Sequence, residues 1–125
     1  MGPYRDRLKL EDLKIRQKCE EMIAYGYVAL RQFPKFERHV LAAEIREAMW
    51  GVLRLIVICN KRYHKKTTMQ DLDAELDLLR SQVRTSFTLR YIDIKKYETW
   101  SRHIDEVGRM IGGWFKSLVR GAGHA

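Results

Sequence analysis

Basic side chains are the residues whose types and spacing point to chemistry in this chain, and that chemistry is phosphate binding. One set, the basic stripe, recurs every seventh residue: Lys95, Arg102, Arg109 and Lys116, with Arg120 beyond it. A second set, the basic turn, falls within the segment NKRYHKKT: Lys61, Arg62, Lys65 and Lys66. Lysine and arginine contact phosphates through their charge and release counterions from the nucleic acid. Both sets are therefore candidate nucleic-acid-binding residues.

Other chemistries have little support in the sequence. The four histidines share no metal-ligand spacing with one another or with a cysteine. Asp71 and Asp73 are two residues apart, so on a helix they point to different sides and do not form a catalytic pair. No glycine-rich phosphate loop and no nucleophile elbow occur. We therefore expect a protein that is not an enzyme and needs no cofactor, with a small helical-bundle enzyme as a minor alternative.

Length, composition and charge agree with a single basic domain. The chain has 125 residues, 46% of them hydrophobic, which is enough for one core. Its 24 Lys and Arg against 16 Asp and Glu give a net charge of +8, which favours an anionic partner such as nucleic acid. Two cysteines make no disulfide framework, and we expect a reducing cytoplasm. The most apolar run, residues 48–59, is too short to cross a bilayer, which needs roughly twenty residues, so no membrane partner is expected.

The basic stripe lies on a segment with strong helical periodicity. Apolar residues there alternate spacings of four and three: Trp100, Ile104, Val107, Ile111, Trp114 and Leu118. This spacing places them in one seam on one side of a helix. If the seam takes the a and d positions of a heptad, the basic stripe takes the f position, farthest from the seam. The pattern predicts a helix that packs with one face and presents cations on the other.

Four long helices fit the remaining pattern and define an all-α fold. We expect them over residues 11–33 and 36–63, from an N-cap at Thr68, and from an N-cap at Asp93 to about residue 121. Pro34 ends the first, since proline disfavours helix in the residue before it. Short connections predict antiparallel neighbours, hence an up-down-up-down four-helix bundle. The single domain then covers residues 1–125, with a basic N-terminal arm at 1–10 and a flexible tail at 121–125.

The middle of the second helix, AMWGVLRLIVIC, is apolar on every side. A helix of this kind must be covered all round, and a single small bundle leaves one face open. We therefore predict a homo-oligomer interface there, formed by Trp50, Leu55, Val57 and Ile58. The alternative is that LRLIVIC forms a buried strand, because short β-branched runs are ambiguous.

Glycines inside the expected helices predict close contacts. Gly26 would allow a close neighbour on the first helix, and Gly108 and Gly112 form a notch on the last. A glycine in a helix costs roughly 1 kcal/mol against alanine. A tight contact with a neighbouring helix or subunit would compensate for that cost.

Two segments resemble a known superfamily of small four-helix-bundle proteins. QFPKFERHVLAAEIREAMWGVL, residues 32–53, resembles the signature of proteins encoded within intervening sequences of bacterial 23S ribosomal RNA genes. EVGRMIGGWFKSL, residues 106–118, resembles the ending of a sister group, the accessory variability determinant (Avd) proteins of diversity-generating retroelements. The second motif is the more specific, because the first is shared across the superfamily.

The resemblance implies a barrel-shaped homopentamer with a basic surface. Proteins of the Avd group bind the reverse transcriptase of their retroelement and nucleic acid, either template RNA or cDNA, and support mutagenic retrohoming. The polymerase carries the chemistry. The resemblance also implies a cytoplasmic protein, encoded by a bacterium, an archaeon or a phage. The alternative is an oligomeric structural protein of the intervening-sequence type with no polymerase partner.

Overall fold

The computed structural model describes residues 3–123, and the surroundings of side chains within residues 12–118. Every regular element in that part of the chain is helical. The elements follow in the order α1 (Pro3–Leu30), the short 3-10 helix η1 (Lys35–Glu37), α2 (Leu41–Lys61), α3 (Lys66–Thr88) and α4 (Ile94–Gly123). The all-α prediction is confirmed, and the segment proposed as an alternative strand lies within α2.

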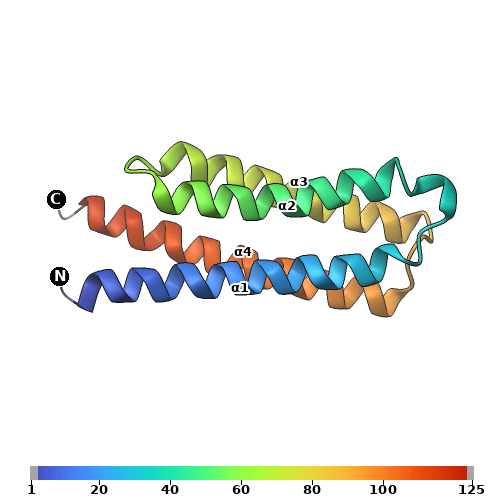
Figure 1. Ribbon diagram of the computed structural model, residues 1–125, viewed down its shortest axis with the longest axis horizontal. Coiled ribbons are helices and arrows are strands. Elements are labelled where there is room, and N and C mark those ends of the chain that lie inside the picture. The colour runs from blue at the N-terminus through green and yellow to red at the C-terminus, as the bar shows by residue number, and fades with distance from the viewer. Residues whose placement is uncertain (1–2, 124–125) are drawn as a thin grey trace.

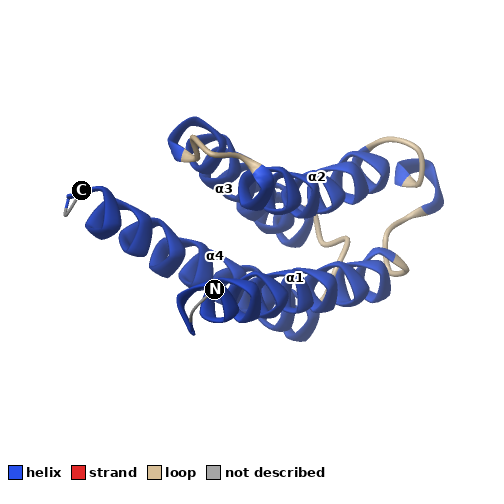
Figure 2. Cartoon of the chain, turned by 60° about the vertical axis from the view of Figure 1, so that its left-hand side comes forward, coloured by secondary structure: helices blue, strands red, loops and turns tan. Residues whose placement is uncertain are grey.

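The four long helices run alternately in opposite directions along one axis (Figure 1). Each packs against two others: α1 against α2 and α4, and α3 against α2 and α4. This arrangement confirms the up-down-up-down bundle. Both chain ends and the α2–α3 turn lie at one end of the bundle, while the α1–α2 and α3–α4 connections lie at the other (Figure 1). Turned by 60°, the molecule shows α1 beside α4 and α2 beside α3 (Figure 2).

The core forms where the apolar sides of the helices meet. In α4 the seam is confirmed: five of its six residues are buried, from Trp100 to Trp114, and Leu118 is partly buried. Gly26 of α1 faces the side chain of Met49, and a Cβ added to it would overlap the methionine sulfur and lie 3.2 Å from Trp100. The close approach predicted for Gly26 is therefore confirmed.

The predicted bounds of the first helix are wrong at both ends. α1 begins at Pro3, so residues 3–10, expected as a separate basic arm, are its first turns. It ends at Leu30, because the next three N–H groups bond to carbonyls three residues back, including Phe33 to Leu30 at 3.1 Å. This tightening is usual in a last helical turn. At the other end of the chain, α4 extends to Gly123 into the expected tail, and residues 124–125 lie outside the described part.

The second helix is shorter than predicted. Residues 35–37 form η1, and α2 begins only at Leu41, because Val40 has a non-helical backbone with φ −116° and ψ −98°. Aromatic rings of the α1–α2 connection lie against the α3–α4 connection at the same end of the bundle. The Phe36 ring lies 6.1 Å from that of Tyr91, and the Phe33 ring lies 5.3 Å from it. These contacts between distant segments were not visible in the helical pattern.

The two predicted N-caps have different outcomes. Asp93 is confirmed: its Oδ1 accepts a hydrogen bond from the backbone N–H of Lys96 at 2.8 Å, and α4 begins at the next residue, Ile94. That hydrogen bond, helped by one from Gln32, holds the pKa of Asp93 below its ordinary value of 3.8. Thr68 is wrong as a cap, because α3 begins at Lys66 and Thr68 lies buried inside it.

Within the described residues, no helix is long and apolar enough to cross a membrane.

Candidate nucleic-acid interface

The antiparallel topology brings the basic turn beside the last turns of α4. A pocket of about 390 Å³ joins them, lined from the turn by Tyr63 and His64 and from α4 by Phe115 and Leu118. Lys116 follows Phe115 directly and is exposed. The basic turn and Lys116, the last residue of the basic stripe, therefore lie at one end of the bundle, although fifty residues separate Lys66 from Lys116 in the chain.

Lys65 serves the turn itself. Its ammonium group donates hydrogen bonds to the carbonyl oxygens of Cys59 at 2.6 Å, Asn60 at 3.1 Å and Arg62 at 2.6 Å. An ammonium group has three N–H donors, so all of them are engaged. The charge also offsets the negative end of the α2 dipole. The geometry gives Lys65 a structural role and leaves the other basic groups of the turn to face solvent.

Those other basic groups are exposed. Lys61, Arg62 and Lys66 are all exposed. Arg62 donates one hydrogen bond, from Nη1 to the hydroxyl of buried Thr68, at 3.0 Å. A guanidinium has five N–H donors, so most of those on Arg62 stay available. We call the group formed by Lys61, Arg62, Lys66 and Lys116 the basic end.

The basic stripe runs along the outer side of α4, as the f-position pattern predicted. All four of its residues are exposed. Two of them have partners on the same helix: Arg109 donates to the Glu106 carboxylate at 2.6 Å, and Arg102 donates to the Thr99 hydroxyl at 3.2 Å. Arg120 lies in α4, but its side chain is outside the described part.

Acidic residues lower the positive charge around Arg102 and Arg109 of the basic stripe, but not around the basic end. Lys18, Glu21, Arg102 and Glu106 line one shallow pocket between α1 and α4, so charges of both signs meet there. By contrast, residues 48–70 and 107–125 contain no Asp or Glu. These two stretches hold the basic turn and the C-terminal part of α4, so positive charge is concentrated at that end of the bundle.

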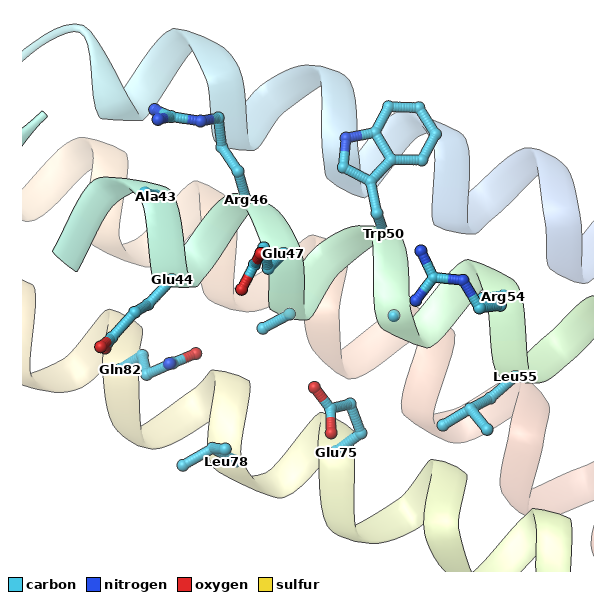
Figure 3. A pocket seen from close by; sticks show the side chains of 12 residues that line it. Ala43, Glu44, Arg46, Glu47, Trp50, Arg54, Leu55, Glu75, Leu78 and Gln82 are labelled. Carbon is cyan, nitrogen blue, oxygen red and sulfur yellow. The ribbon is translucent and has the colours of Figure 1, made fainter. Parts of the chain in front are cut away.

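A different surface lies between α2 and α3. There a broad groove of about 990 Å³ has Trp50 and Leu55 on the α2 side and Leu78 on the α3 side (Figure 3). Its charges are mixed, with Glu47 and Glu75 among its acids and Arg46 and Arg54 among its bases. Mixed charge around apolar side chains is unsuited to a phosphate backbone and typical of contact with protein.

The four residues predicted for the oligomer interface are not buried within one chain. Trp50 is 45% exposed, and its indole N–H donates to the Tyr27 hydroxyl at 3.0 Å. Leu55, Val57 and Ile58 are half-buried. The two glycines of the predicted notch have different surroundings. A Cβ on Gly108 would overlap Arg80 of α3, whereas one on Gly112 would meet open space. The predicted close contact is thus present within the chain only at Gly108.

The pocket between the basic turn and α4, which we call the end pocket, also has aromatic side chains that the sequence analysis did not identify as site residues. Tyr63 is 92% exposed, its ring meets His64 edge-on at 4.9 Å, and Phe115 is 37% exposed. A signal was present, since Tyr63 and His64 interrupt the run of basic residues in the turn. Aromatic residues between cations in a turn are a pattern of single-strand binders. Nothing in the local sequence, however, connects Phe115 to that turn.

These features define a class: a basic, antiparallel four-helix-bundle protein whose positive charge is concentrated at one end. The sequence profile of the bAvd-like family matches residues 13–118, which is most of the chain. The chain therefore belongs to the bAvd-like family. No curated protein matches it significantly.

Proposed function

We propose that this protein is a non-enzymatic accessory factor that binds nucleic acid and the reverse transcriptase of a diversity-generating retroelement. It would support cDNA synthesis from a template RNA, and so mutagenic retrohoming. Membership of the bAvd-like family supports the polymerase partner. The basic end supports the nucleic acid and is the observation that carries the proposal, because Lys61, Arg62, Lys66 and Lys116 are exposed in stretches without acids.

We further propose that the protein works as a homo-oligomer, a pentamer by its family resemblance. The supporting observation is the α2–α3 groove, where Trp50 and Leu78 remain 45% and 52% exposed. Repeating one subunit around an axis would repeat its basic end in the same orientation. A ring of such ends would hold one strand through several weak contacts, and so more tightly than one subunit alone.

The nucleic-acid part is tested by RNA binding over a series of salt concentrations. The logarithm of the affinity should fall with the logarithm of salt, by about 0.7 per phosphate contact for a single strand. Replacing the four residues of the basic end with glutamine should reduce that slope by up to about 3. A second variant, with Lys95, Arg102, Arg109 and Lys116 as glutamine, measures the share of the basic stripe.

A matched control removes the same charge from the opposite end of the bundle. Glutamine replaces four exposed residues there: Arg31, Lys35, Arg38 and Arg84. Each variant loses four charges, from +8 to +4, so net charge is equal and only position differs. Equal losses of binding in the control and the basic-end variant would show that only overall charge matters. No binding by the wild type at low salt would refute the nucleic-acid proposal.

The polymerase part is tested separately, by looking for a reverse transcriptase gene beside the gene for this chain and testing whether the two proteins co-purify. We expect a stable complex that survives loss of the basic end, because the enzyme would use another surface. An oligomer that does not co-purify with a reverse transcriptase would instead favour the structural protein of the intervening-sequence type.

A further inference from the structure

We propose that the end pocket is a stacking site for an unpaired nucleobase, with the basic end holding the adjoining phosphates. This inference rests on the proposed function, since it specifies which form of nucleic acid the basic end selects. It makes the protein a reader of single-stranded segments rather than of duplex.

The first argument is the exposure of Tyr63. Its ring is 92% exposed, and within the described residues its one aromatic contact is a T-shaped one with His64 at 4.9 Å. A single neighbour and so high an exposure leave at least one face of the ring open to a planar ligand. Stacking of a base on an aromatic face needs a base that is free of a duplex, and it tolerates any base because each has a π-face.

The second argument is the pocket behind the ring. Met69, Phe115 and Leu118 give it an apolar wall, and its volume of about 390 Å³ lies within the roughly 300–1,000 Å³ usual for small-ligand sites. Its size suits one base and not a helix of paired bases. Because Phe115 comes from α4 and Met69 from α3, the folded bundle holds the two sides together.

The third argument is the charge around the opening. None of the seven lining residues is acidic, and Lys66 is one of them. α3 begins at Lys66, so the first N–H groups of a 23-residue helix also lie at this edge. Such groups have no partners within their helix and attract anions. An apolar pocket with cations around its mouth matches a nucleotide, which is flat and apolar in its base and anionic in its phosphate.

The test compares Tyr63→Leu and Tyr63→Phe for binding to a single-stranded RNA and to a duplex of the same sequence. Both substitutions leave the charge unchanged and alter a side chain that is almost fully exposed, so folding should be unaffected. Phe36→Leu, at the other end of the bundle and 72% exposed, is the matched control. Circular dichroism checks the fold of each variant.

We expect Tyr63→Leu to weaken single-strand binding by about five- to a hundredfold, which is the range for loss of one stacked base. Duplex binding and the salt slope should stay as in the wild type, and Tyr63→Phe should retain single-strand affinity. Equal binding by Tyr63→Leu and wild type would overturn the stacking site while leaving the proposed function intact. Absence of RNA binding by the wild type would overturn both.

Discussion

Replacing Trp50 with glutamine should separate the subunits without unfolding them. Trp50 is 45% exposed beside the α2–α3 groove, and its indole N–H donates to the Tyr27 hydroxyl. Glutamine keeps an N–H donor and removes the indole surface. If a neighbouring subunit covers that surface, the variant loses most of what the indole contributes to assembly.

The size of the effect follows from the exposed area. A buried tryptophan covers up to about 250 Å², so its 45% exposed part is roughly 110 Å². At about 25 cal/mol per Å², covering that area stabilises one subunit contact by about 2.8 kcal/mol. The association constant at each contact should therefore fall by up to about a hundredfold. Leu78→Gln, on the other helix of the groove and 52% exposed, should act in the same direction.

Multi-angle light scattering over a dilution series measures the assembly. The wild type should remain oligomeric where Trp50→Gln has become monomeric, with unchanged far-ultraviolet circular dichroism. Leu13→Gln is the control, because Leu13 is even more exposed, at 60%, but lies in α1 and does not line the groove. A monomeric wild type, or a Trp50→Gln variant that assembles as the wild type does, would refute the reasoning that the groove is a subunit contact.

Three further predictions concern stability and reactivity. Gly112→Ala should stabilise the protein by about 1 kcal/mol, because its Cβ meets open space. Gly108→Ala should gain less, because its Cβ would overlap the Arg80 guanidinium and lie 3.1 Å from Leu76; equal urea midpoints would contradict this. Asp93→Ala should lower stability at neutral pH. Because the native pKa of Asp93 is depressed, the extra stability of the wild type over Asp93→Ala is fully present above pH 3.8 and disappears as pH falls through the lower native pKa. A stability difference in urea melts that does not change with pH would exclude this role. Burial, with a smaller effect of Glu20, raises the pKa of Cys19 to about 12, so iodoacetamide should label it only after unfolding, and mass spectrometry showing rapid native labelling would argue against that.

The parts of the fold that were predictable are those governed by local periodicity. The α4 seam from Trp100 to Trp114 and the Asp93 cap follow from spacing and from one side-chain hydrogen bond, and both are confirmed. The start of α2 was not predictable in the same way. The segment before it carries Phe36, whose ring lies 6.1 Å from that of Tyr91, a residue more than fifty positions away, and periodicity carries no information about such a contact.

The candidate site divides along the same line. Exposure of the basic stripe follows from its heptad position and was predictable. Whether a cation is free was not, because this depends on acceptors that the fold brings near. Lys65 is the clearest case: it reads as one more cation in a basic run, yet its three donors are engaged by carbonyls at the end of α2.

Topology also explains why the two proposed surfaces need not compete. In an up-down-up-down bundle the α2–α3 turn must lie at the same end as both termini (Figure 1). That geometry joins the basic turn to the end of α4, and so forms the basic end at a tip of the bundle. The α2–α3 groove runs along the side instead, lined only by residues of those two helices (Figure 3). Subunits that pack side by side through Trp50 would leave every basic tip open, so assembly would add nucleic-acid contacts rather than cover them.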